Sequence, residues 1–193
     1  MSSMMKRLLE EHEKLRQLSS VICELLEGDE PCDLRLLARS RWELASTAYR
    51  HLVFEERQVF QRLLTDPRPE ARMMSERSRE AIQQLHSAYK THVDAWTAEE
   101  VVARWREFGI AVTMLVRHMN IRIGFEEKHL FPLLGDDPQP LPTRLPGARN
   151  WAGDAVALES AIKLQASLPV PAAIAAGARA MTRREGKCPA SAY

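Results

Sequence analysis

One ten-residue pattern occurs twice in this 193-residue chain, and it constrains the fold more than any other feature. Residues 51–60, HLVFEERQVF, align without a gap with residues 122–131, RIGFEEKHLF. Upstream of each copy lies another segment of helical periodicity that carries one histidine on its apolar side, His12 in the first half and His86 in the second. A helix pair that is duplicated in this way is typical of an up-down bundle with pseudo-twofold symmetry.

Apolar residues recur at helical spacing through four long segments, which are residues 3–26, 33–64, 70–96 and 97–135. Gly28 ends the first segment, and Asp33 is a favourable N-cap for the second. Thr97 and Glu100 have the spacing of a capping box at the start of the fourth. Since no segment alternates like a strand, the sequence predicts an all-α, antiparallel up-down four-helix bundle.

The composition of the chain changes near Pro138. A proline-rich linker begins there, and the residues after it are rich in alanine. We therefore predict two parts, a four-helix bundle over residues 1–135 and a linker with a C-terminal extension, helical or disordered, over residues 136–193.

Bulk properties exclude several classes of protein. A net charge of +1 does not indicate a general nucleic-acid or membrane-surface binder. No window holds the roughly 18 apolar residues that a membrane span requires. Cys23, Cys32 and Cys188 are widely spaced and are expected to be free thiols in a reducing compartment, so we expect a cytoplasmic protein. No glycine-rich phosphate loop or nucleophile–base pattern is present in the sequence.

Several polar side chains are predicted to point into the bundle core. His51 and Glu55 are four residues apart and share one helix face, and Glu126 occupies the matching stripe on the fourth segment. His12 and His86 also fall among apolar residues of their own segments. Burial of such groups without partners is costly, and convergence on a cation removes the cost. A mixture of imidazole and carboxylate suits iron or manganese.

A lone histidine followed by HxxxEE, with the same scheme repeated, resembles the hemerythrin-type cation-binding domain over about residues 4–135. The resemblance implies a bundle in which the HxxxE helices supply histidines and bridging carboxylates, while the other helices supply further histidines. The positions that match this family pattern are His12, His51, Glu55, His86 and Glu126.

The chain departs from the family pattern at Arg122, where the resemblance implies a histidine. Arginine has no lone pair for a metal, but its guanidinium could pair with Glu55 and Glu126 and replace one ion. His118, one turn earlier and roughly 80° around the helix from Glu126, is a further candidate ligand that could substitute only with distortion. We therefore predict at most one tightly held ion, near His12, His51 and Glu55.

Three functions follow from these observations. The first is a non-haem iron or manganese protein that senses or handles oxygen, nitric oxide or the metal itself. The second is a metal-free regulatory bundle that binds a protein partner, similar to bacterial anti-sigma regulators. An oxidase or an iron–sulfur repair enzyme ranks third, and the latter is expected to carry an additional cysteine-bearing N-terminal domain.

Glu56 and Glu127 are predicted to be solvated helix-surface charges.

Overall fold

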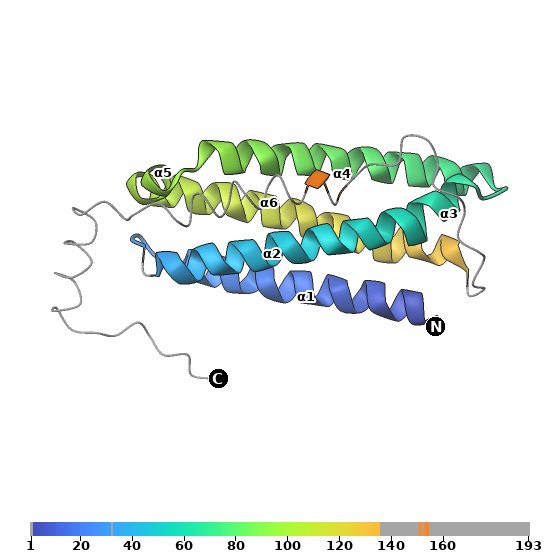
Figure 1. The fold of residues 1–193 in the computed structure, drawn as a ribbon, viewed down its shortest axis with the longest axis horizontal. Coiled ribbons are helices and arrows are strands. Elements are labelled where there is room, and N and C mark those ends of the chain that lie inside the picture. The colour runs from blue at the N-terminus through green and yellow to red at the C-terminus, as the bar shows by residue number, and fades with distance from the viewer. Residues whose placement is uncertain (1, 32, 136–150, 152, 155–193) are drawn as a thin grey trace.

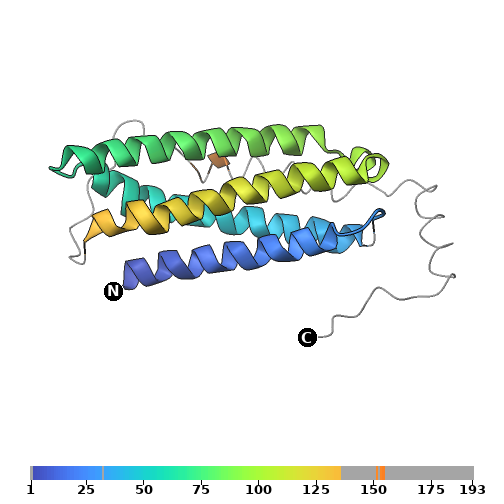
Figure 2. The same cartoon turned by 180° about the vertical axis from the view of Figure 1, so that it is seen from behind.

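The computed structural model describes residues 2–31, 33–135, 151 and 153–154, and within these residues it contains helices and no strand. Four long helices lie side by side along the long axis of the molecule (Figures 1 and 2). They are α1 (Ser3–Leu25), α2 (Leu34–Glu55), α4 (Pro69–Ala95) and α6 (Trp105–Phe125). α1 packs against α2 and α6, and α6 also packs against α4. The predicted four-helix bundle is confirmed.

The helices begin and end close to the predicted residues because side chains and glycines satisfy their ends. The side chain of Asp33 accepts a hydrogen bond from the backbone N–H of Leu36 at 2.9 Å, as expected for an N-cap. Gly28 follows α1 with a φ of 123°, a conformation that favours glycine. Thr97 caps its helix through the N–H of Glu100.

The fourth predicted segment is wrong in one respect, since it is not continuous. Thr97 opens a short helix, α5 (Ala98–Ala103), and the chain then turns at Arg104, where φ is −130° and ψ is 48°. The long helix α6 starts only at Trp105, whose ring N–H donates a hydrogen bond to the carbonyl of Gly28 at 3.1 Å. This contact and the burial of Trp105 hold the start of α6 against the loop after α1.

Each copy of the repeat passes from α-helix into a π-helical turn at its pair of glutamates. α2 continues through η1 (Glu56–Phe60) into α3 (Gln61–Leu64), and α6 continues through η2 (Glu126–Leu130) into the 3₁₀ turn η3 (Phe131–Leu134). A π turn takes an extra residue, and such turns are frequent at functional sites. The consecutive residues Glu55 and Glu56, where α2 meets η1, are both buried.

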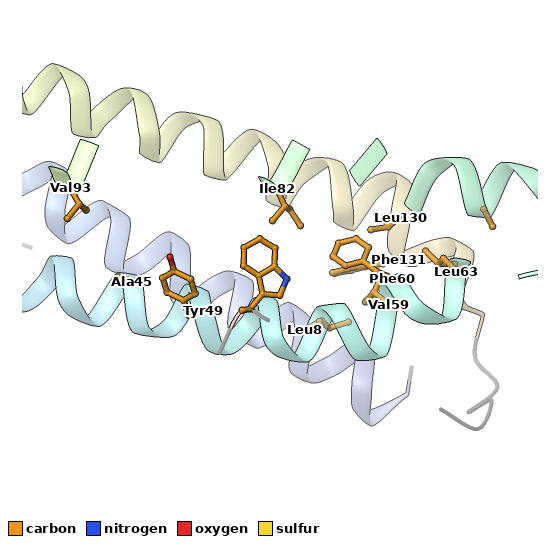
Figure 3. Close-up of a cluster of buried hydrophobic side chains, with 12 residues drawn as sticks. Leu8, Ala45, Tyr49, Val59, Phe60, Leu63, Ile82, Val93, Leu130 and Phe131 are labelled. Carbon is orange, nitrogen blue, oxygen red and sulfur yellow. The ribbon is translucent and has the colours of Figure 1, made fainter. Parts of the chain in front are cut away.

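The apolar core consists of two clusters. The first surrounds the π turns and includes Leu8, Phe60, Leu130 and Phe131 (Figure 3). The second lies around the α1–α2 loop and α5, and is composed of Ile22, Leu37, Trp96, Val101, Trp105, Phe108 and Val112. Burial of these large side chains supplies the main driving force for folding.

Most of the predicted linker and C-terminal extension, residues 136–193, lies outside the described residues, so the domain boundary at residue 135 stays a prediction. Trp151 is described there, and its buried side chain belongs to the first core cluster. Among the described residues no helix has the length and apolar character needed to cross a membrane. Cys23 is a half-buried free thiol, while Cys32 and Cys188 are outside the described residues.

Candidate metal centre

The centre of the candidate site is a pair of buried histidines from neighbouring helices. His12 on α1 is 0% exposed and His51 on α2 is 4% exposed. Their Nε2 atoms face each other at 3.1 Å. The ring of His12 also stacks on Phe131, with 5.2 Å between ring centroids, so the first core cluster fixes its orientation.

The other nitrogen of each ring is held by a carboxylate. His12 Nδ1 lies 2.9 Å from Glu127 Oε1, and His51 Nδ1 lies 3.0 Å from Glu11 Oε2. Because a carboxylate accepts hydrogen bonds, each Nδ1–H is the donor. In the neutral imidazole this arrangement leaves the Nε2 lone pair free, which is the state in which histidine binds a metal.

Two buried carboxylates complete the set. Glu126 Oε2 lies 3.2 Å from His12 Nε2, and Glu55 Oε2 lies 3.7 Å from His51 Nε2. Both oxygens of Glu55 are buried and have no hydrogen-bond partner among the described residues. Acceptor atoms from four side chains therefore converge at one place, which is unfavourable unless a proton or a metal cation lies among them.

The spacing of these atoms fits a metal ion. Suitable ligand atoms of His12, His51 and Glu126 all lie within 4.8 Å of one another. Two nitrogens at about 2.1 Å from one ion, at roughly a right angle, would be about 3 Å apart, and the two Nε2 atoms are separated by 3.1 Å. Nitrogen and carboxylate ligands suit a divalent transition metal. The residues therefore fit a cation.

The two inward carboxyl groups differ in their electrostatic surroundings. Burial, followed by the nearby charge of Glu126, raises the pKa of Glu55 well above its ordinary value. Burial also raises the pKa of Glu126, but the contact with the His12 imidazole and the charge of Arg122 outweigh it and hold that pKa below its usual range. Of the two, Glu126 is therefore the group that more readily binds a cation as a carboxylate.

Arg122 lies beside this centre and pairs with Glu126, as its position in the sequence predicted, but among the described residues no ion pair joins it to Glu55. Its Nε is 2.6 Å from Glu126 Oε1, the oxygen that does not face His12, and its side chain is 11% exposed. Its charge also lowers the pKa of Glu55, although burial has the larger, opposite effect. Arg122 therefore places a fixed positive charge next to both carboxyl groups.

Glu56 and Glu127 are not the solvated surface charges that the sequence predicted. Glu56 is 4% exposed and pairs with Arg79 at 3.2 Å. Glu127 is half-buried and binds both His12 and Arg16, the latter at 2.7 Å. The error arises because each helix contacts neighbours on two sides, so that Glu56 faces Arg79 on α4 and Glu127 faces His12 and Arg16 on α1.

The remaining two predicted ligands, His86 and His118, are not in this cluster. His86 is half-buried on α4, lines the cavity beside the centre and contacts the rings of Tyr49 and Trp151 edge-on. His118 is exposed on α6, because its position is rotated away from the stripe that carries Glu126. The structure therefore brings together His12, His51, Glu55 and Glu126.

The outer carboxylates Glu11 and Glu127 were missed by sequence reasoning. Glu11 directly precedes His12, so ordinary helix phasing places it on a different face, yet it reaches across to His51 on α2. Glu11 also pairs with Arg7 at 2.8 Å, as Glu127 does with Arg16. The spacing of Arg7 and Glu11 was visible in the sequence as an ordinary helix pair. The contacts of both glutamates with other helices appear only when the helices are packed.

Comparison with known proteins agrees with this geometry. The sequence model of the hemerythrin HHE cation-binding domain matches residues 3–134, which span the whole bundle. No significant match was found among curated proteins or among solved structures. Since the match covers well over half of the chain and includes every residue of the centre, this protein belongs to the hemerythrin HHE cation-binding domain family.

Proposed function

We propose that the protein binds one non-haem iron ion, with manganese as the alternative metal, through His12, His51, Glu55 and Glu126. The observation that carries this proposal is the convergence of four buried acceptor groups, of which His12, His51 and Glu126 have their outer atoms already held by neighbouring charged side chains. Outer carboxylates of this kind orient histidine ligands and make them more basic. A transition metal also satisfies the buried oxygens of Glu55.

A single ion is supported by the position of Arg122. Its guanidinium occupies the side of Glu126 that is turned away from His12, where a bridging carboxylate would meet a second metal. A cation there would be repelled by the fixed charge of arginine. His86, the remaining candidate for a second ion, is engaged with aromatic rings instead.

The proposed role is to sense or handle oxygen, nitric oxide or iron itself. A ferrous ion with an open coordination position supplies the chemistry for binding a small diatomic molecule. The support from this chain is a cavity lined mostly by aliphatic side chains that reaches His51, Glu55 and Glu126. Apolar gases enter such a space readily, while the surrounding side chains exclude bulk water.

Metal content measured by elemental mass spectrometry, on protein purified without a His tag or chelator, tests the proposal. We expect about one iron or manganese ion per chain, lost in His51→Ala and in Glu126→Gln. His118→Ala is the matched control, because that exposed histidine lies outside the cluster, and it should keep the metal. Anaerobic addition of nitric oxide should then change the absorption spectrum of the wild-type protein and not that of His51→Ala.

The alternative is the metal-free regulatory bundle that binds a protein partner. It would be favoured if the wild-type protein, although folded, held no metal after anaerobic loading with ferrous or manganous ions. In that case Arg122 and a proton on Glu55 would neutralise the centre permanently, and the bundle would act through its surface.

A further inference from the structure

The cavity beside the metal centre continues far along the bundle. It has a volume of about 160 Å³ and lies between α1, α2, α4 and α6. Beyond His51 its walls are formed by aliphatic side chains, among them Leu44, Ala48, Leu85, Val112 and Leu115. An apolar cavity of about 150 Å³ is large enough to bind a small hydrocarbon. The far end, however, is not apolar.

Arg41 on α2 closes that far end of the cavity. Its Nη2 is buried and has no hydrogen-bond partner among the described residues. The guanidinium lies over the ring of Phe108, 5.1 Å from the centroid. A cation–π contact offsets only part of the cost of burying a charged group. Arg41 as a whole is half-buried, but the buried end of its guanidinium lacks the anion that usually accompanies a buried arginine.

The groups around Arg41 do not supply that anion. Its neighbours along the cavity are Tyr89 and His92. Burial raises the pKa of Tyr89, so the phenol keeps its proton, and burial together with the charge of Arg41 lowers the pKa of His92 to about 4. No carboxylate of the described residues pairs with Arg41, and burial lowers the pKa of Arg41 as well. This end of the cavity therefore carries a net positive charge at neutral pH.

We propose that this cavity binds a medium-chain, unbranched monocarboxylate, with its carboxylate on Arg41 and its aliphatic tail along the channel toward Leu52 and Met119. The guanidinium can bind a carboxylate bidentately, and the Tyr89 hydroxyl can donate a further hydrogen bond. Arg41 and His51, which both line the cavity, are ten positions apart on α2, which corresponds to about 15 Å along the helix. The channel is therefore long for its volume. A slender chain fits this shape better than a ring.

The carboxylate site is separate from the metal centre. At about 15 Å from His51, a carboxylate on Arg41 cannot contact the ligand atoms of the centre. The ligand would instead fill the apolar channel through which a small gas would reach the metal. The proposal itself does not depend on whether a metal is bound.

Isothermal titration calorimetry of the full chain with octanoate, octanol, hexanoate and acetate tests the proposal. Octanoate should bind, acetate should not, and affinity should rise about fourfold for each added methylene from hexanoate to octanoate. Octanoate should bind at least tenfold more tightly than octanol, because only the acid can pair with Arg41.

The variants separate the two parts of the site. Arg41→Met, which keeps the length of the side chain and removes its charge, should bind octanol as the wild type does and lose the preference for octanoate. Arg39→Met, an exposed arginine on the same helix, should keep the wild-type preference. Ala45→Leu, which narrows the channel next to Arg41, should weaken both ligands. Equal binding of octanoate by wild type and Arg41→Met, or no binding of octanoate to the folded wild-type protein, would overturn the proposal.

Discussion

Arg122 Nε lies 2.6 Å from Glu126 Oε1, while the other oxygen of the same carboxylate lies 3.2 Å from His12 Nε2. One carboxylate thus connects a fixed positive charge to the proposed metal ligands. Glutamate in this position can bridge two cations, and here one of the two is part of the protein. If the centre holds metal as proposed, residue 122 should set the number of ions.

Arg122→His should allow the protein to bind additional metal. Removing the guanidinium removes the repulsion of a second cation, and the new imidazole supplies a lone pair next to Glu126. We expect metal content to rise from about one toward two ions per chain by elemental mass spectrometry. Arg117→His, an exposed position on the same helix, is the control and should leave the content at one. An unchanged content in Arg122→His would contradict the role given to Arg122.

Replacing the outer carboxylates should weaken metal binding without removing a ligand. Glu127→Gln and Glu11→Gln each take away a charged acceptor that orients a histidine ring. We expect a 10- to 100-fold loss of affinity in each case, about 1.4 to 2.7 kcal/mol, measured by competition with a chelator of known affinity. Glu10→Gln, which removes an exposed charge on the same helix, should bind as the wild type does. Equal affinities in all four proteins would show that the histidines need no orientation by these groups.

Much of this fold could be predicted from the sequence because it depends on local periodicity. The apolar stripes predicted α1, α2, α4 and α6, and the caps at Asp33 and Thr97 were correctly placed. The break at Arg104 was missed, since it depends on Trp105 reaching the carbonyl of Gly28, a contact between distant parts of the chain.

The candidate site was only partly predictable, for a physical reason that the glutamate pairs illustrate. Phasing on a regular α-helix places Glu55 and Glu126 inward, and the structure agrees. It places Glu56 and Glu127 outward, because 3.6 residues per turn rotates successive side chains by about 100°. Each helix, however, contacts neighbours on two sides, so Glu56 reaches Arg79 on α4 and Glu127 reaches His12 and Arg16 on α1. Contacts of this kind between helices leave no pattern in a single sequence.

Leu130→Ala should strongly destabilise the bundle. Leu130 is 0% exposed and lies in the first core cluster at the end of the π turn η2 (Figure 3). Loss of its side chain should lower the free energy of unfolding by about 2–5 kcal/mol, as a transfer and a cavity contribution add. Urea denaturation measures this change. Ile110→Ala is the control, because Ile110 is 64% exposed on α6, the helix that leads into η2, and it should change the free energy of unfolding by less than about 0.5 kcal/mol.

The stability of the protein should depend on His92 between pH 6.5 and about 4. Burial, with a smaller contribution from the charge of Arg41, lowers the pKa of His92 from 6.5 to about 4. The unfolded chain therefore takes up a proton in this range before the folded protein does, so stability falls as the pH falls. Urea denaturation at several pH values should show a shallower loss of stability in His92→Gln than in the wild type, with His118→Gln following the wild type because His118 is exposed. Parallel pH profiles for all three proteins would mean that His92 takes up its proton equally in the folded and unfolded states.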